Sequence, residues 1–555
     1  MTARLPSKPR LYWETLRHLK LVQFTGRIKR MLWRQRLDLT PFAGSVRTTS
    51  TTWVRHAARP QSQFGASRFR FLSVDGDIDN LGWDNPTIDK LWRYNLHYFD
   101  DFAATDADQR HDWHHTLIDR WISENPPSAG SGWEPYPTSI RIVNWVKAGL
   151  SGFDLGAAAQ NHLALQTRWL FQNLEYHLLG NHLMTNAKAL LFAGHYFEGK
   201  EAALWRAKGT ALLIEQLHEQ ILRDGGHFEL SPMYHALALE DILDVYNLVK
   251  ALPVLQDAQE VALSKLLRSK IAPMRRWLQA MTHPDGRLAH FNDCAQGIAP
   301  TNGALEDYAM RLGLDVEEFR FSGITQLLDS GYVRADQADA VAIADVGHIG
   351  PDYLPGHAHA DTLSFELSVH NERIFVNGGT SVYGTGSDRL TQRSTASHNT
   401  LTYNGHNSSE VWSGFRVARR AKPTGLTIIK DGDIEISCAH DGYRRFAGGP
   451  YHRRKWSFGD CKITVSDALI EGEGSAIARF HLHPDCTLHV KQDGYSGTIV
   501  TKLGTVIEWQ SHETPAQDMP SCHNPEFGIS KASSMLSLPL INGTSSMTFS
   551  WKPRP

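Results

Sequence analysis

Residues 235–250 read HALALEDILDVYNLVK, and their spacing sets the helical character of the first half of the chain. Large apolar side chains recur there at intervals of three and four residues: Leu239, Ile242, Leu243, Tyr246 and Val249. This spacing places them on one face of an amphipathic helix. Five neighbouring segments have a similar pattern: 139–150, 157–174, 181–197, 200–222 and 258–278. Successive helical hairpins of this length pack as a ring or as a solenoid, and no exact internal repeat decides between the two.

Beyond about Gly331 the period of the apolar pattern changes to two, which is typical of half-buried strands. The alternating segments include 341–346, 400–403, 434–438, 462–469 and 498–503. Turn-forming pairs such as Asn542-Gly543 lie between or beyond them, as in an antiparallel sandwich. Helices followed by strands indicate two segregated domains. We predict an α+β multidomain chain with a basic, partly helical segment at 1–80, a helical domain at 81–328 and a β-sandwich at 329–555.

The composition excludes several classes of protein. A net charge of −2 over 555 residues gives no reason to expect nucleic acid as a partner. The sequence contains no apolar run of the length of a secretory signal or a transmembrane segment, so we expect a cytoplasmic protein. The five cysteines are widely spaced and form no CxxC pair, which predicts reduced thiols.

The N-terminal segment differs from the rest in charge. Residues 1–37 contain ten Lys or Arg side chains against one acidic side chain, Glu14. A solvated helix face explains this run. Contact with a membrane surface or with an acidic polymer explains it as well.

Two polar clusters lie at predicted helix starts. Asn181 and His182 open one helix, where free backbone N–H groups and the positive end of the helix dipole favour a bound carboxylate. The alternative is that Asn181 is only an N-cap. Ser231 and Pro232 form a second start signal, which places Tyr234 in the first turn of the next helix.

A third cluster, GHAHAD at 356–361, holds three ionisable side chains. In a strand, His357, His359 and Asp361 would share a face, which suits a metal site or a proton-transfer site better than a core. The stretch RSTASHNT at 393–400 adds His398, which by itself is more typical of a structural histidine.

Together these clusters resemble the heparinase II/III family of polysaccharide lyases. The resemblance covers residues 90–410 and rests on six motifs in order: WEPYP at 133–137, GNH at 180–182, ELSPMYH at 229–235, HAHAD at 357–361, VNGGT at 376–380 and SHNT at 397–400. It implies an (α/α) toroid, an incomplete barrel of helical hairpins, followed by an antiparallel β-sandwich. It also implies β-elimination on a uronic-acid-containing polysaccharide or oligosaccharide.

The resemblance also implies roles for individual residues. Such a lyase removes the C5 proton of a uronate and expels the C4 oxygen, and the uronate carboxylate must be neutralised meanwhile. Asn181 would bind that carboxylate with help from His182, Tyr234 would protonate the leaving oxygen, and His357 would be a base. Further positions are expected to bind substrate: Trp133, Glu134, Arg141, Glu229 and Tyr383.

The family pattern further implies one structural divalent metal, zinc or calcium. Its ligands would be His359, Asn377 and His398. Asn377 departs from the family pattern, which has Asp there, and an amide is a poor zinc ligand. Asp361 is a substitute by composition, although its spacing fits a hydrogen-bonding role equally well.

Three other functions stay open at the level of sequence. A glycoside hydrolase needs two opposed carboxylates, for which Glu134, Glu229 and Asp293 are candidates. A uronate C5-epimerase shares the proton abstraction. A non-catalytic glycan-binding protein of exopolysaccharide assembly would use the same surface without chemistry.

Overall fold

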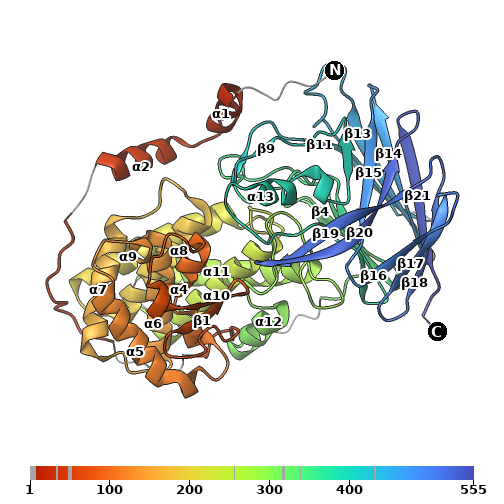
Figure 1. The fold of residues 1–555 in the computed structure, drawn as a ribbon. Helices are drawn as coiled ribbons and strands as arrows, with labels where there is room; N and C mark the ends of the chain where they lie inside the picture. The colour runs from red at the N-terminus through yellow and green to blue at the C-terminus, as the bar shows by residue number, and fades with distance from the viewer. Residues whose placement is uncertain are drawn as a thin grey trace.

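The computed structural model describes residues 8–32, 36–47, 53–254, 257–315, 319–337, 339–430 and 433–554. Most of its helices gather in one domain and most of its strands in a second (Figure 1), as the change of period predicts. The principal helices are α4 Lys90–Leu96, α5 His111–Glu124, α6 Pro135–Leu150, α7 Gly156–Gln172, α8 Gly180–Tyr196, α9 Lys200–Gln220, α10 Pro232–Ala251, α11 Ala258–Ala280 and α12 Asn302–Arg311. Among the described residues, no helix combines the length and apolarity that crossing a bilayer requires.

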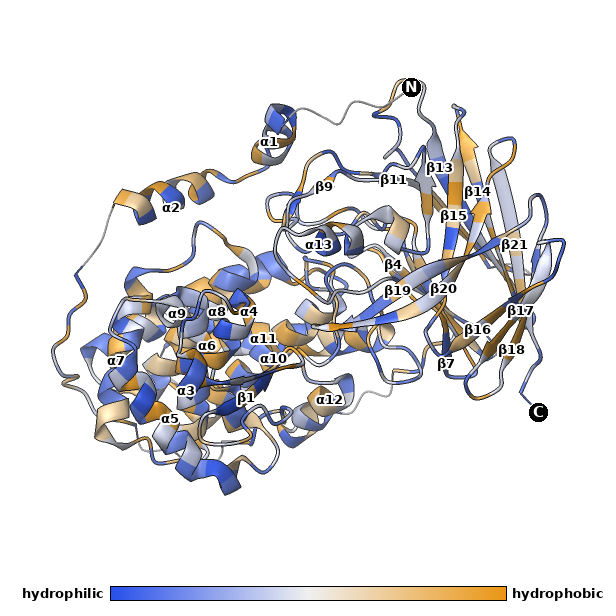
Figure 2. Ribbon diagram, viewed as in Figure 1, coloured by the Kyte–Doolittle hydropathy of each residue, from blue (hydrophilic) through white to orange (hydrophobic). Residues whose placement is uncertain are grey.

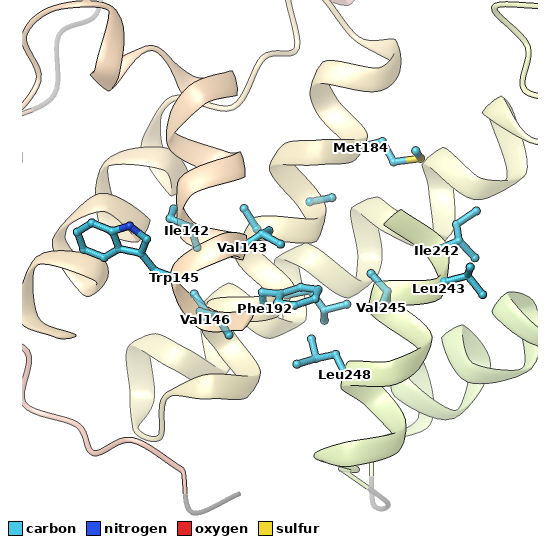
Figure 3. Close-up of a cluster of buried hydrophobic side chains, with 14 of the residues drawn as sticks. Ile142, Val143, Trp145, Val146, Met184, Phe192, Ile242, Leu243, Val245 and Leu248 are labelled. Atoms are coloured by element: carbon cyan, nitrogen blue, oxygen red, sulfur yellow. The ribbon is translucent and has the colours of Figure 1, made fainter. Parts of the chain in front are cut away.

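Helix α8 is the central helix of the helical domain. It packs against α6, α9 and α10, and every residue from Leu183 to its end is buried. Figure 3 shows its contribution to the core together with those of α6 and α10: Ile142, Val143, Trp145, Val146, Met184, Phe192, Ile242, Leu243, Val245 and Leu248. Burial of each large apolar side chain contributes about 1.5–3 kcal/mol. This core fixes the first turn of α8, where the predicted site begins.

Three large antiparallel sheets, together with a small two-stranded one, make up the described part of the β domain. One has five strands in order: β3 Gly323–Leu327, β4 Tyr332–Gln337, β5 Ala340–Asp345, β6 Phe365–Val369 and β7 Glu372–Phe375. The largest runs β11 Pro423–Ile429, β12 Ile434–His440, β13 Tyr451–Gly459, β14 Lys462–Ile470, β21 Thr544–Trp551, β18 Val506–Ser511, β17 Ser496–Thr501 and β16 Cys486–Val490. The third runs β19 Gln517–Glu526, β20 Ile529–Pro539, β15 Ala476–His481 and β8 Leu401–Tyr403.

Aromatic side chains from all three sheets join them into one core. Phe375 of β7 lies 4.7 Å from Phe549 of β21 and 5.7 Å from Phe480 of β15, measured between ring centroids. Strand β3 pairs with β4 along its whole length and begins at Gly323. The strands therefore begin slightly before the predicted boundary at 329. The sequence does not reveal β3, because this short strand shows no clear alternation of apolar and polar residues.

The N-terminal segment contains two helices, α1 Lys8–Leu16 and α2 Leu21–Leu32, followed by the hairpin of β1 Arg68–Phe71 and β2 Val74–Asp77. Figure 1 shows α1 and α2 on the outside of the molecule, apart from the body of the helical domain. Helix α1 lies near the small hairpin of β9 Val411–Trp412 and β10 Arg416–Val417. These two helices thus contact both domains from outside.

Candidate active site

The predicted catalytic residues meet where the helical and β domains touch. Tyr234, in the first turn of α10, has its ring centroid 4.0 Å from that of His357, which comes from the loop between β5 and β6. The hydroxyls of Tyr234 and Tyr383 lie 2.9 Å apart. Asn181 belongs to the first turn of α8, next to Glu229. Both domains therefore contribute to a single site.

The start of α8 has a tight geometry that requires glycine. Leu179 is the N-cap and makes no side-chain cap bond, and Gly180 has φ +56°. A Cβ at position 180 would come within 2.3 Å of Leu354 and 3.1 Å of the Glu229 carboxylate. Asn181 is the second residue of the helix, so the N-cap alternative for Asn181 is wrong.

Three polar groups already contact Asn181. Its backbone N–H donates to the Glu229 carboxylate, and its side chain is hydrogen-bonded to the phenol of Tyr136. Thr185 Oγ1 lies 3.4 Å from the Asn181 side-chain oxygen. The N-terminal end of α8 therefore already binds the carboxylate of Glu229. Asn181 stays partly exposed beside it.

His182 pairs with a carboxylate at the N-terminal end of α8. Its Nδ1 lies 3.2 Å from Glu175 Oε1, and its ring lies 4.6 Å from that of Tyr136. Burial lowers the pKa of His182, the Glu175 charge raises it, and the net pKa lies above the ordinary value. A charged imidazole and a helix N-terminus both favour a bound anion.

Burial keeps Tyr234 protonated. It raises the pKa of the Tyr234 phenol well above its ordinary value, and the neighbouring Tyr383 and Asp293 add to the shift. Tyr383 is also partly buried, and its pKa is raised well above the ordinary value by desolvation and by the Asp293 charge. A neutral phenol can donate a proton to a leaving oxygen.

Asp293 organises the histidines, and sequence reasoning considered it only as a hydrolase carboxylate. His357 Nδ1 lies 2.8 Å from Asp293 Oδ2, and His359 Nε2 lies 2.9 Å from Asp293 Oδ1. Both guanidinium nitrogens Nη1 and Nη2 of Arg389 also donate to this carboxylate, the second at 2.6 Å. Nothing near residues 292–294 in the sequence predicts this, because the partners lie 64 to 96 residues away.

The charge of Asp293 fixes the tautomer of His357. Burial alone would raise the pKa of Asp293, but Arg389 and the two histidines hold that pKa well below its ordinary value. An ionised carboxylate only accepts hydrogen bonds, so His357 Nδ1 carries the proton. The lone pair of Nε2 is then free for proton transfer, and Nε2 lies 3.6 Å from Glu229 Oε2.

The HAHAD segment is a loop between β5 and β6, so its residues do not share the face that a strand would give them. His357 and His359 nevertheless converge, because both bind Asp293. Asp361 is buried and accepts the backbone N–H of Asn292 at 3.3 Å, which is the hydrogen-bonding role.

Two expected substrate-binding residues belong to the core instead. Trp133 is buried, and its indole N–H donates to the carbonyl of Asn125. Arg141 is fully buried, donates to Gln166 at 2.8 Å and lies over the ring of Trp121. Both side chains are enclosed by protein, so neither can touch a polysaccharide, and these two predictions are wrong.

The other expected substrate-binding residues lie near the site. Glu134 is partly exposed, accepts from the Tyr94 phenol and lies 3.0 Å from Lys90. Its charge contributes to the raised pKa of His182. Glu229 is buried, and its Oε2 finds no hydrogen-bond partner among the described residues.

The predicted metal ligands are only partly brought together. His359 Nδ1 and His398 Nε2 lie 3.0 Å apart, in hydrogen-bond contact. The side chain of Asn377 is used in other hydrogen bonds. Its Oδ1 accepts the backbone N–H of Asn399 at 3.0 Å, and its Nδ2 donates to the Ser364 hydroxyl oxygen at 3.3 Å. Two imidazoles beside an engaged amide lack the further imidazole, thiolate or carboxylate of a closed zinc site. The residues present do not fit this metal.

We therefore expect purified protein to contain much less than about one divalent ion per chain. Chelation should leave its melting temperature unchanged, since a bound structural ion would stabilise the fold by mass action. Elemental analysis and thermal melts with and without chelator measure both quantities. Stoichiometric zinc or calcium, together with a lower melting temperature after chelation, would contradict this expectation.

Comparison with known proteins identifies the family. The heparinase II/III N-terminal model matches residues 20–309, and the heparinase II/III-like C-terminal model matches residues 322–540. The chain belongs to the heparinase II/III family. A crystal structure of heparinase III superposes with a TM-score of 0.67 at 17% identity, covering 99% of this chain and 92% of that one. This likeness confirms the predicted fold class, a helical toroid followed by a β-sandwich.

Two curated relatives match this heparinase II/III family chain over different lengths. A heparin-sulfate lyase of Bacteroides stercoris is 25% identical over 411 residues, covering 64% of this chain and 59% of the relative. The chain thus spans about three fifths of that lyase. FtsZ-localized protein C of Caulobacter vibrioides is 24% identical over 498 residues, covering 81% of each chain.

Proposed function

We propose that this protein is a polysaccharide lyase that cleaves an acidic, uronic-acid-containing glycan by β-elimination. The observation that carries the proposal is the convergence of Asn181, Tyr234 and His357, with the Nδ1 of His357 held by Asp293. The heparin-sulfate lyase relatives support an acidic glycosaminoglycan as the substrate class.

In this mechanism His357 Nε2 takes the C5 proton of the uronate. The electrons form the C4–C5 double bond as the C4–O bond breaks, and the Tyr234 phenol protonates the departing oxygen. The side-chain amide of Asn181 donates to the uronate carboxylate, and the cationic His182 lies close by. These groups stabilise the charge that develops on the carboxylate as the proton leaves.

Glu229 fits a supporting role as a neutral acid. Burial raises the pKa of Glu229, although His357 and the backbone N–H of Asn181 oppose the shift. A protonated Glu229, 3.6 Å from His357 Nε2, carries no charge and would not oppose the negative charge that develops on the uronate carboxylate. An ionised Glu229 would repel that carboxylate, so binding should weaken as the pH rises through its raised pKa.

A Glu229→Gln variant tests this role, because glutamine is uncharged at every pH. We expect the variant to retain activity within about tenfold of the wild type, because Glu229 transfers no proton in this mechanism. Loss of a general acid or base would typically lower activity by about 10²–10⁴. The Glu229-dependent loss of kcat/KM at high pH should disappear in the variant. A loss of activity larger than about tenfold at every pH would show that the Glu229 carboxylate acts in its charged form.

A panel of acidic polysaccharides, read by ultraviolet absorbance of the unsaturated product, tests the lyase reaction itself. An epimerase, a hydrolase and a binding protein produce no conjugated double bond. The hydrolase alternative has little support, because Asp293 is fully buried and bound by Arg389, and Glu229 is buried as well. An absorbance increase with at least one uronan supports the proposal, and none across the panel contradicts it.

Glycan binding without catalysis is the second candidate function. The observation that favours it is the match of FtsZ-localized protein C, whose name describes a location and no reaction, to 81% of this chain. Retention on an immobilised uronan without any absorbance increase would favour binding over the lyase reaction.

A further inference from the structure

Helix α2 is amphipathic in the reverse sense to an ordinary surface helix. Of its 12 residues, all of them described, Gln23 alone is buried. Its side-chain amide nitrogen Nε2 lies 3.4 Å from the carbonyl oxygen of Tyr353 and 3.5 Å from that of Leu178. A surface helix normally turns apolar side chains toward the protein, whereas α2 turns a polar one inward.

The opposite face of α2 is apolar and exposed. Five side chains at intervals of one, three or four residues are between 38% and 77% exposed: Leu21, Phe24, Ile28, Met31 and Leu32. They form one stripe, since residues three and four apart are neighbours on a helix. Figure 2 shows apolar colouring on α2, which lies outside the body of the helical domain. Contiguous exposed apolar surface of this kind marks an interaction site.

Basic side chains accompany the apolar stripe. Residues 21–32 include Arg27, Lys29 and Arg30 and no acidic residue. Arg30 lies 2.8 Å from His177 Nε2, toward the protein, whereas Arg27 and Lys29 are exposed. Apolar residues with exposed cations match a surface that is apolar inside and anionic outside.

Specific contacts hold α2 in this orientation. A Cβ at Gly26 would come within 2.9 Å of the His177 backbone, so the helix approaches the α7–α8 loop closely at this glycine. Lys20 pairs with Glu219, and its ammonium lies 3.9 Å from the ring centroid of Tyr353. The inward face is therefore used by the protein, and the apolar stripe is left facing outward.

Helix α1 secures the other end of this segment. The rings of Tyr12 and Trp412 meet edge to face at 5.0 Å, and the Trp412 indole N–H donates to Thr15 Oγ1 at 3.1 Å. Both ends of the segment are thus attached, one to each domain.

We propose that the outer face of α2 binds the surface of an anionic lipid bilayer. A second copy of the chain is a poorer partner, because pairing two α2 helices would bring their basic side chains together. An acidic polysaccharide complements the charge but not the apolar stripe. Membrane binding is independent of the proposed lyase reaction.

Co-sedimentation of the full chain with vesicles tests this inference. One set contains phosphatidylcholine alone, and in the other about a third of the lipid is phosphatidylglycerol. We expect binding to the anionic vesicles that is at least about tenfold stronger than to the neutral ones and that weakens with added salt. Ile28→Asp, in the middle of the stripe, should lower the partition coefficient at least about tenfold.

Leu503→Asp is the matched control, because Leu503 is also exposed but lies in the turn between β17 and β18 in the other domain. It should bind as the wild type does.

Lys29→Glu, which leaves the apolar stripe intact, should also weaken binding to anionic vesicles, and melting temperatures check that each variant is folded. The proposal would be overturned if the wild-type protein does not bind anionic vesicles. It would also be overturned if Ile28→Asp and Leu503→Asp bind them equally well. Concentration-dependent dimers that Ile28→Asp abolishes, without vesicle binding, would assign the face to a second copy instead.

Discussion

A Tyr234→Phe variant is expected to fold normally and to lose turnover by about 10²–10⁴, the contribution typical of a general acid. The change keeps the ring that packs 4.0 Å from His357 and deletes only the hydroxyl that would protonate the leaving oxygen. Substrate binding should change little, so the loss should appear in kcat rather than KM. Initial rates on the best substrate of the polysaccharide panel measure it.

Tyr383→Phe provides the control for this variant. It removes the other member of the hydroxyl pair and leaves the Tyr234 phenol in place. Its effect should be much smaller, because Tyr383 contacts Tyr234 rather than the proposed leaving oxygen. Equal losses in the two variants would instead identify the pair as the acid, and a wild-type rate for Tyr234→Phe would remove Tyr234 from the mechanism.

Asn181→Asp is expected to be stable and nearly inactive, with a loss of about 10²–10³ as for other groups that stabilise developing negative charge. The fold should tolerate the change, since an acidic side chain in the first turn complements the helix dipole. The new carboxylate would face the uronate carboxylate and lie near Glu229, which raises the energy of the developing enolate. Activity relative to the wild type should recover as the pH falls toward about 4, where the new carboxyl group becomes neutral.

Asn181→Ala separates loss of the amide from gain of charge. It should be less impaired than the aspartate variant, because it adds no repulsion. A folded Asn181→Asp variant with near-normal activity on a uronan would contradict the carboxylate-binding role.

The two periodicities predicted the fold class because each reports directly on which side chains are buried. Motif order similarly predicted Asn181, Tyr234 and His357, which the structure brings to one site. Trp133 and Arg141 lie in a motif of the same family, but a motif does not distinguish a site residue from a core residue. Only their burial reveals that both are structural.

The binding of His357 by Asp293, and of Asp293 by Arg389, is not predicted by the sequence for a different reason. Their importance comes from contacts between segments 64 to 96 residues apart, and neither residue has a periodic or motif-like neighbourhood. The alternation of the HAHAD segment would place its ionisable side chains on one face of a strand, but the segment is a loop. A loop can also bring His357 and His359 to one partner, so alternation alone does not identify a strand.

The division of the site between two domains also limits how such a chain can change during evolution. His357, Tyr383 and Arg389 come from the β domain, whereas Asn181, Tyr234 and Asp293 come from the helical domain. Exchange of one domain for that of a distant relative would separate His357 from the carboxylate that sets its tautomer. Changes at this boundary therefore have to arise in compensating pairs. The outer strands β16, β17 and β18 supply none of these side chains and can diverge independently.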